Sequence, residues 1–347
     1  MRLLIVSDAW APQVNGVVTS LQALVGELRA MGHQVEVLSP QGFRCVPCPG
    51  YGEIPLAWNL WRVGPAIEAF APDCVHLATE GPLGWAARRW LLRRGLAFSS
   101  AVHTRFPEYL TARCAWIGLG VGYACLRLFH RRSQAVLVST ERLRSGLAQR
   151  GLKRLVLWRK GVDTQRFSPR PGLAAPVSAI FLYVGRIAPE KNLQAFLDLQ
   201  LPGDKWVVGD GPQRQMLEQA YPGVKFFGYQ HGEALAEFYR RASVLVFPSR
   251  TDTYGLVMLE AQACGTPVAA FAVAGPLDVV VPGVTGVLAD NLRDACLAAL
   301  EVDRRRCAEV AGRQSWRASA VEFLASQPLL DGAPVTGERS VSAARSC

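Results

Sequence analysis

Two acidic residues on either side of a glycine turn are the part of the sequence best suited to hold a sugar. Asp252 and Glu260 are separated by seven residues, with Gly255 between them, and they follow the apolar run Val244–Phe247, which is typical of a buried strand. The turn is expected to open a helix, whose free N–H groups and positive dipole end favour a phosphate. An acid on that helix can accept hydrogen bonds from sugar hydroxyls. This segment therefore predicts a nucleotide-sugar site.

Two cations in a second segment could bind a diphosphate. Arg186 and Lys191 lie five positions apart, after the apolar run Ile180–Val184 and before a helix expected from about Asn192. Guanidinium and ammonium groups form charge-assisted hydrogen bonds with phosphate oxygens, so the pair could grip a diphosphate from two sides. Ordinary charges at a helix start are the alternative interpretation.

A glycine turn follows the predicted strand Lys205–Val208. Gly209 and Gly211 have no side chains, so the backbone there could approach a ligand closely. A plain surface turn is the competing interpretation for each of these residues.

Segments 184–192 and 249–268 together resemble the retaining glycosyltransferases of family 4, which have the two-domain GT-B fold. The family pattern is an acid, seven residues and Glu, combined with an upstream Gly-Arg-x-x-x-x-Lys-Asn segment. This chain carries Asp252 where the family usually has Glu, so that carboxylate reaches less far by one methylene. The resemblance covers about residues 1–325.

The resemblance implies a role for each site residue. Glu260 would bind the nucleotide ribose, Asp252 the sugar hydroxyls, and Arg186 and Lys191 the pyrophosphate. The catalytic residues that it implies are His103, Arg186, Lys191 and Asp252. The other donor-binding residues are Gly16, Gly209, Gly211, Tyr254, Gly255 and Leu256.

The first half supplies further candidates at predicted strand ends. Gly16 lies in the loop after Leu3–Ser7, where the family carries a glycine-containing loop facing the donor phosphates. His103 ends the strand Phe98–Val102, and the carboxyl ends of parallel strands are where α/β folds bind ligands. The candidates for acceptor contacts are Glu80, Arg105, Glu108 and Tyr109.

We expect no metal and no cofactor besides the nucleotide-sugar co-substrate. The sequence has no Asp-x-Asp, the metal-binding motif of the other main glycosyltransferase fold, and Cys45-x-x-Cys48 has no second pair at zinc-ligand spacing. Cationic side chains and helix ends would then stabilise the charge on the leaving diphosphate.

Strand-like and helix-like segments alternate in both halves, which predicts parallel, doubly wound sheets. The expected fold class is α/β of the GT-B type: two Rossmann-like domains with parallel sheets facing a central cleft. We expect an acceptor-side domain over residues 1–165, joined by a C-terminal helix at about 312–327, and a nucleotide-sugar-binding domain over residues 173–311. Residues 328–347 lack periodicity and are predicted to be disordered.

The net charge of +10 belongs entirely to the first half. Residues 1–162 hold 20 Lys and Arg against 9 Asp and Glu, whereas residues 163–347 hold 18 against 19. Arginines at 88, 89, 93 and 94 lie among Trp85 and Trp90, a mixture that suits an anionic membrane surface. No nucleic-acid-binding motif is recognised. We expect a cytoplasmic protein, peripheral at the inner face of the cell membrane.

The expected reaction is transfer of a hexose from a UDP- or GDP-linked donor to a hydroxyl. Stretches such as Thr79–Gly84 and His103–Tyr109 resemble bacterial enzymes that glycosylate lipids, namely diacylglycerol glycosyltransferases and α-mannosyltransferases of lipid carriers, so a lipid acceptor is favoured over a glycan acceptor. Two alternatives stay open: a nucleotide-sugar 2-epimerase, whose acid/base residues are not recognisable here, and a non-catalytic nucleotide-sugar-binding protein.

Overall fold

The computed structural model of this 347-residue chain describes residues 1–13, 15–48, 51–103, 118–170, 172, 178–252 and 254–331. Arg105, Glu108, Tyr109 and residues 332–347 of the expected tail lie outside the described residues. The chain forms two compact units. The first comprises Met1–Arg159 and the chain from Trp316 onward, and the second comprises Lys160–Ser315.

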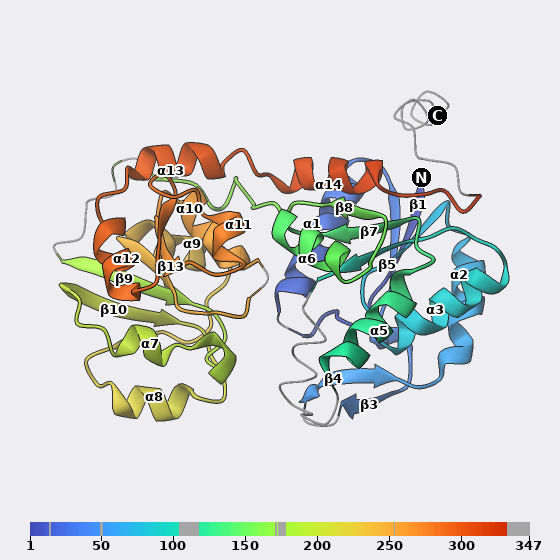
Figure 1. The fold of residues 1–347 in the computed structure, drawn as a ribbon, viewed down its shortest axis with the longest axis horizontal. Helices are drawn as coiled ribbons and strands as arrows, with labels where there is room; N and C mark the ends of the chain where they lie inside the picture. Colours follow the sequence, from blue (N-terminus) through green and yellow to red (C-terminus); the bar gives the residue numbers. More distant parts are fainter. Residues whose placement is uncertain are drawn as a thin grey trace. The chain divides into compact units, whose positions relative to one another are not determined.

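The first unit contains a six-stranded sheet in which every neighbouring pair is parallel, in the order β2-β1-β5-β6-β7-β8 (Figure 1). The strands are β1 (Arg2–Val6), β2 (Gln34–Leu38), β5 (Cys74–Leu77), β6 (Ser99–Val102), β7 (Ala135–Val138) and β8 (Leu155–Leu157). Leu3 of β1 pairs with Val35 on one side and Cys74 on the other. Because all strands run the same way, their carboxyl ends share one edge.

Helices cover both faces of this sheet, because the buried side chains of β1 alternate between two cores. Leu3 and Ile5 belong to a core with α1 and α14, while Leu4 and Val6 belong to a core with α2 and α3. Asn15 begins α1, since its Oδ1 accepts hydrogen bonds from the N–H groups of residues 17 and 18. The helices are α1 (Gly16–Ala30), α2 (Val63–Phe70), α3 (Pro82–Arg93), α5 (Leu119–His130), α6 (Glu141–Gln149) and α14 (Trp316–Ala325).

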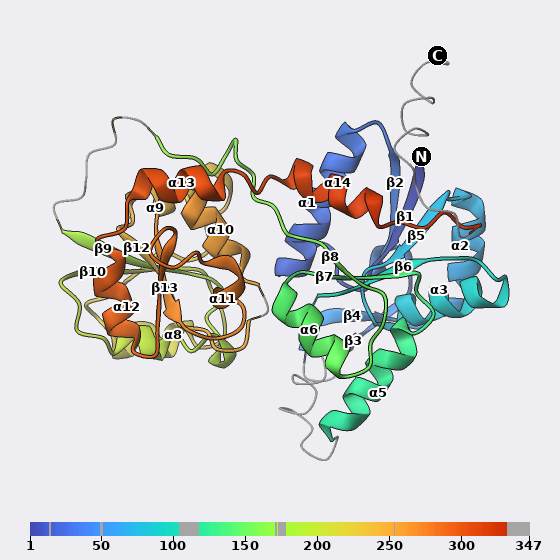
Figure 2. The same cartoon turned by 45° about the horizontal axis from the view of Figure 1, so that its top comes forward.

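The C-terminal helix α14 returns to the first unit and lies beside α1 (Figure 2). The indole N–H of Trp158 donates to Ser319 Oγ at 3.0 Å, and Ser99 Oγ donates to Gln327 Oε1 at 2.5 Å. Phe323 is fully buried against the sheet. The chain before the second unit and the chain after it are therefore fixed to each other within the first unit.

The second unit repeats this architecture with the parallel strand order β11-β10-β9-β12-β13-β14. Its strands are β9 (Ala179–Val184), β10 (Gly203–Val208), β11 (Lys225–Phe226), β12 (Val244–Phe247), β13 (Val268–Phe271) and β14 (Gly286–Ala289). Its helices are η3 (Pro189–Lys191), α7 (Gln194–Leu197), α8 (Arg214–Ala220), α9 (Gly232–Arg241), α10 (Leu256–Ala263), α11 (Pro276–Val279), α12 (Leu292–Ala299) and α13 (Arg304–Ala311). The expected pair of α/β domains with parallel sheets is confirmed.

Three details differ from the sequence expectations. β8 adds an edge strand to the first sheet that the sequence did not indicate. An antiparallel hairpin, β3 (Cys45–Cys48) with β4 (Tyr51–Ala57), was not expected, because its proline-containing strands lack a clear alternation. The units divide at Lys160 and Trp316, since Val162 N–H donates to the Gln314 carbonyl at 2.7 Å inside the second unit. Among the described helices, none has the length and apolar content needed to cross a bilayer.

Candidate functional site

Three loops of the second unit meet at the carboxyl edge of its sheet. β9 lies between β10 and β12, so the loops that leave these three strands are neighbours. They are residues 185–188, 209–213 and 248–255, which contain most of the donor-site residues expected from the sequence. This edge is where parallel α/β sheets bind ligands.

An ion pair connects the two segments that carry the motifs. Lys191 Nζ lies 2.6 Å from Asp252 Oδ1, and both side chains are largely covered. Asn192, in the left-handed conformation, donates from Nδ2 to the Pro248 carbonyl at 3.1 Å. Thr251 Oγ1 donates to the Glu190 carbonyl at 3.3 Å. The fold therefore brings together residues that are sixty positions apart in the chain.

The second oxygen of Asp252 is the feature of this pair that points to a ligand. Asp252 Oδ2 is buried and has no hydrogen-bond partner in the described part of the chain. Burying a carboxylate oxygen without a partner costs free energy, so this oxygen calls for a hydrogen-bond donor. A sugar hydroxyl could supply the missing donor.

The glycines at 209 and 211 are required by contact between two loops. A Cβ added to Gly209 would lie 1.9 Å from the Gly185 carbonyl oxygen, and one on Gly211 would lie 2.4 Å from that of Ile187. The Ile187 N–H also donates to the Asp210 carbonyl at 2.8 Å. The absence of a Cβ at these two positions therefore lets the two loops pack closely against each other. A donor contact at these residues stays a prediction.

Gly255 sets the direction of α10. It has φ of +78°, which favours glycine, and a Cβ there would lie 2.9 Å from both Met258 Cε and Phe247 Cζ. Leu256 is the first residue of α10, so its N–H belongs to the unpaired group at the helix start. Tyr254 donates its hydroxyl to the Lys160 carbonyl at 3.5 Å.

Glu260 lies on α10 with one oxygen engaged. Tyr239 donates its hydroxyl to Glu260 Oε2 at 2.8 Å. Burial raises the pKa of Glu260 to about 7, against the opposing effects of the Tyr239 hydrogen bond and the positive charge of Arg166. The carboxyl group therefore changes its charge close to neutral pH.

Arg186 is exposed in the loop that follows β9, and its backbone carbonyl is bound by a buried residue of that strand. The buried Tyr183 hydroxyl donates to the Arg186 carbonyl at 2.8 Å. Burial, together with the charges of Asp252 and Glu190, raises the pKa of Tyr183 well above its usual value, so the phenol stays neutral. Arg186, Lys191, Asp252 and Tyr183 therefore belong to one edge of one unit.

The remaining described candidates belong to the first unit. Gly16 is the first residue of α1, and a Cβ there would meet no atom within 4 Å, so packing of the described residues does not demand glycine. His103 follows β6 and packs edge-on against Trp158, with ring centroids 5.8 Å apart. Their expected donor contacts stay predictions.

The Glu80 side chain contacts a buried chain of polar residues that the sequence did not reveal, and its role in binding the acceptor stays a prediction. His130 Nε2 lies 3.2 Å from Glu80 Oε1, and His130 Nδ1 lies 2.8 Å from Ser100 Oγ, which lies 2.7 Å from Ser133 Oγ. His130 and both serines are buried. The only sequence signal was a histidine in the last turn of an apolar helix, which is more often structural.

The described residues contain no group of three or more His, Cys, Asp or Glu that could hold a metal ion. The expected metal independence stays a prediction, because it concerns the reaction as well as the residues. The cationic side chains at this edge include Arg186 and Lys191.

Comparisons with known proteins find similar proteins over most of the chain. A family model described as Glycosyltransferase Family 4 matches residues 14–166, and one described as Glycosyl transferases group 1 matches residues 178–302. The chain is 31% identical to a GDP-mannose-dependent alpha-mannosyltransferase of Mycobacterium tuberculosis, covering 97% of this chain and 98% of that protein.

Two further comparisons extend this result. The chain is 25% identical to a GDP-mannose-dependent alpha-(1-6)-phosphatidylinositol dimannoside mannosyltransferase of Mycobacterium tuberculosis, covering 94% and 96% of the two chains. Among solved structures it is similar to sucrose-phosphate synthase from Thermosynechococcus elongatus, with a TM-score of 0.74, 22% identity and coverage of 93% and 97%. The structural likeness confirms the expected class of fold.

Proposed function

Because the chain belongs to glycosyltransferase family 4 and is a glycosyltransferase, we propose that it transfers mannose from GDP-mannose to the hydroxyl of a membrane lipid, with retention of configuration. The donor part rests on the relatives named as GDP-mannose-dependent. The sequence alone left UDP- and GDP-linked donors equally open.

The observation that carries this proposal is the Lys191–Asp252 ion pair, in which one carboxylate oxygen has no hydrogen-bond partner among the described residues. Lys191 offers positive charge beside a carboxylate whose Oδ2 is buried and unpartnered within the described chain. A nucleotide sugar has the complementary chemistry, namely an anionic diphosphate joined directly to a ring of hydroxyl donors. Lys191 would bind the diphosphate and Asp252 a sugar hydroxyl.

In this proposal each residue of the site has a separate role in the reaction. Arg186 and Lys191 stabilise the negative charge that grows on the diphosphate as the glycosidic bond breaks, which is where fixed charges accelerate such a reaction most. Glu260 accepts hydrogen bonds from the ribose. The acceptor oxygen attacks from the face that the diphosphate leaves, and a diphosphate oxygen takes its proton. The donor contacts that the family resemblance implies for His103 and Gly16 stay predictions.

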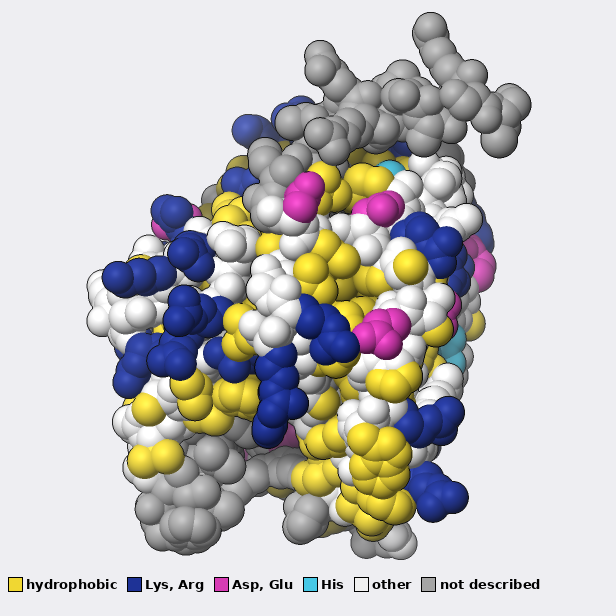
Figure 3. Space-filling model, turned by 90° about the vertical axis from the view of Figure 1, so that its right-hand side faces the viewer, with side chains coloured by type: hydrophobic (Ala, Val, Ile, Leu, Met, Phe, Trp, Pro, Cys, Tyr) yellow, Lys and Arg dark blue, Asp and Glu magenta, His cyan; other side chains and the backbone are white. Residues whose placement is uncertain are grey.

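A lipid acceptor is supported by the surface of the first unit, with one correction. Arg88 is not a surface charge: it is buried and donates to the Phe129 and Leu128 carbonyls at 2.7 Å each, at the end of α5. Arg94 pairs with Glu68 at 2.7 Å. The arginines that remain exposed on and after α3 and α5 include Arg89, Arg93, Arg131 and Arg132. Figure 3 shows basic and hydrophobic side chains side by side on one face.

An exposed tryptophan pair adds an apolar element to this surface. Trp58 and Trp61 are 46% and 68% exposed, with ring centroids 5.6 Å apart, on the turn between β4 and α2. The turn itself is fixed, because the Arg44 N–H donates to the oxygen of buried Asn59 at 2.9 Å. Amphipathic rings beside arginines suit the headgroup layer of an anionic bilayer.

We expect the double substitution Trp58→Ala/Trp61→Ala to weaken binding to anionic vesicles by about tenfold, because two rings no longer enter the interface. Co-sedimentation with phosphatidylglycerol-containing and purely zwitterionic vesicles measures this. Tyr229→Ala is the matched control, since Tyr229 is 48% exposed on the other unit. Equal vesicle binding by the native protein and the double variant would remove the tryptophans from the membrane contact.

The proposed reaction is tested by incubating the full chain with radiolabelled GDP-mannose or UDP-glucose and a bacterial lipid extract. We expect label in the organic phase from GDP-mannose, and no loss of transfer in EDTA because cationic side chains take the place of a metal. Label that appears only in water-soluble glycans would contradict the lipid acceptor. Transfer from UDP-glucose alone would contradict the donor.

A further inference from the structure

Helix α9 carries two adjacent buried residues that bind different parts of the second unit. Tyr239 is fully buried and edge-on to Phe167, with ring centroids 5.8 Å apart, and its hydroxyl reaches Glu260 on α10. Arg240 is also buried and reaches the segment that enters the unit. Neither residue was singled out from the sequence, because both fit the pattern of an amphipathic helix.

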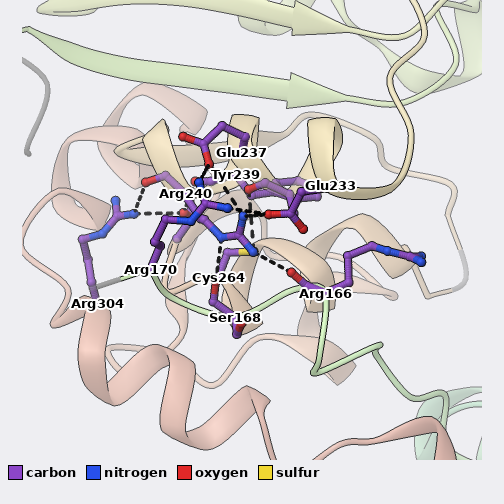
Figure 4. A network of polar contacts seen from close by, with 11 residues as sticks. Arg166, Ser168, Arg170, Glu233, Glu237, Tyr239, Arg240, Cys264 and Arg304 are labelled. Carbon is purple, nitrogen blue, oxygen red and sulfur yellow. Dashed lines mark hydrogen bonds and ion pairs between the residues drawn. The ribbon is translucent and has the colours of Figure 1, made fainter. Parts of the chain in front are cut away.

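The Arg240 side chain fixes the end of α9 (Figure 4). Its Nε donates to the Ser168 carbonyl at 2.8 Å, its Nη2 to the Arg166 carbonyl at 2.6 Å, and its Nη1 to Glu233 Oε1 at 2.5 Å. Arg304 of α13 donates to the Arg240 carbonyl at 2.9 Å. The turn that bears Tyr239 is therefore bound from several sides.

The backbone of Tyr239 is bound as well, so its hydroxyl has little freedom to move. Thr266 Oγ1 donates to the Tyr239 carbonyl at 2.5 Å, and Arg304 Nη2 donates to that same Thr266 oxygen at 3.2 Å. A phenol has only two side-chain torsions, and packing of the ring restricts both. The donor to Glu260 is consequently preorganised.

The two oxygens of Glu260 are in different situations. Oε2 accepts the Tyr239 hydroxyl at 2.8 Å, whereas Oε1 has no hydrogen-bond partner among the described residues and is not among their buried unpartnered atoms. Oε2 is thus held by Tyr239, whereas Oε1 can accept a hydrogen bond from a ligand. This is the arrangement needed to present a single acceptor in a fixed orientation.

We propose that Tyr239 is a positioning residue: by holding Oε2 of Glu260, it turns Oε1 toward the ribose hydroxyls of the donor. This rests on the proposed function, because Glu260 is taken there as the ribose ligand. Tyr239 itself touches no donor atom in this proposal and acts only through Glu260.

The charged and titratable groups that face Glu260 are Tyr239 from α9, Arg166 from the entering segment and Cys264 from α10 itself. Burial raises the pKa of Tyr239 well above its usual value and that of Cys264 to about 12, so both are neutral near pH 7. Glu260 is then the group of this set that titrates near neutrality. Loss of the Tyr239 hydrogen bond removes an influence that lowers its pKa.

The test is Tyr239→Phe, which removes one hydroxyl and keeps the ring in the core. We expect the Kd for GDP to rise roughly tenfold, since a hydrogen bond to a charged group is lost. We also expect the acid limb of kcat/KM to move to higher pH. Tyr221→Phe is the matched control, because it removes a tyrosine hydrogen bond to Asp198 between α8 and the segment after α7.

The double variant Tyr239→Phe/Glu260→Gln separates positioning from a general loss of packing. If Tyr239 acts through Glu260, the double variant binds GDP as Glu260→Gln does, so the two changes are not additive. Additive losses, or a Tyr239→Phe protein with native affinity and an unmoved acid limb, overturn the positioning role. A Glu260→Gln protein with native affinity instead overturns the proposed ribose contact.

Discussion

Replacing Lys191 with methionine is expected to lower kcat by about 10²–10³-fold, with a smaller effect on KM. Electrostatic groups placed where charge develops in the transition state typically contribute this much. Lys191 Nζ lies 2.6 Å from Asp252 Oδ1 at the edge of the sheet, so the position of its ammonium group is set before the donor binds. Steady-state kinetics with GDP-mannose, supported by single-turnover measurements, gives the two constants separately.

A second Lys–Asp pair in the same unit provides the control. Lys225 Nζ lies 2.6 Å from Asp204 Oδ2, near the beginning of β10 and thus away from the carboxyl edge. Lys225→Met removes the same kind of group at the same N–O distance from its partner, in a more exposed position, and kcat should stay native. A folded Lys191→Met protein with kcat within about threefold of native would contradict the role of Lys191 in transition-state stabilisation.

The loss of activity has to be distinguished from a loss of folding. Without Lys191, both oxygens of Asp252 would lack a partner, and leaving one member of a covered ion pair uncompensated is destabilising. Asp252→Asn in the Lys191→Met background removes that charge. We expect this double variant to regain part of the lost stability while remaining inactive, because the positive charge for the diphosphate is still missing.

Local sequence pattern indicated which residue types lie at the candidate donor site and where in the chain they occur, while their contacts with a donor stay predictions. Short apolar runs marked β9 and β12, and the charged residues after them had to lie at one edge of a parallel sheet. The contact between Lys191 and Asp252 could not be predicted from local pattern, since it depends on the pairing of two strands some sixty residues apart. Spacing within a motif contains no information on such a pairing.

Other residues were missed or misassigned for related reasons. Tyr239 and His130 lie on helices whose apolar periodicity explains them fully as core residues, so no local signal separated them. Arg88 was interpreted as part of a membrane surface, whereas its guanidinium closes the carbonyl end of α5. In each case a long-range contact decides the role.

Glu260→Gln is expected to weaken donor binding at least tenfold and, at the same time, to stabilise the fold above neutral pH. The amide keeps one acceptor for the Tyr239 hydroxyl but presents a weaker, uncharged partner to the ribose. The native carboxyl is expensive to ionise where it lies, since burial raises its pKa from 4.5 to about 7. Removing the ionisable group removes that cost.

The pH dependence follows from the sign of this shift. Between about pH 4.5 and 7 the folded protein holds a proton on Glu260 that the unfolded chain has released, so the native protein loses stability as pH rises through this window. The gain from Glu260→Gln should therefore be small at pH 4.5, grow to about 1–3 kcal/mol by pH 8, and change little above. Urea unfolding at pH 5 and pH 8 measures it. An equal gain at both pH values would show that burial does not raise the pKa of Glu260 in the folded protein, and would contradict this prediction.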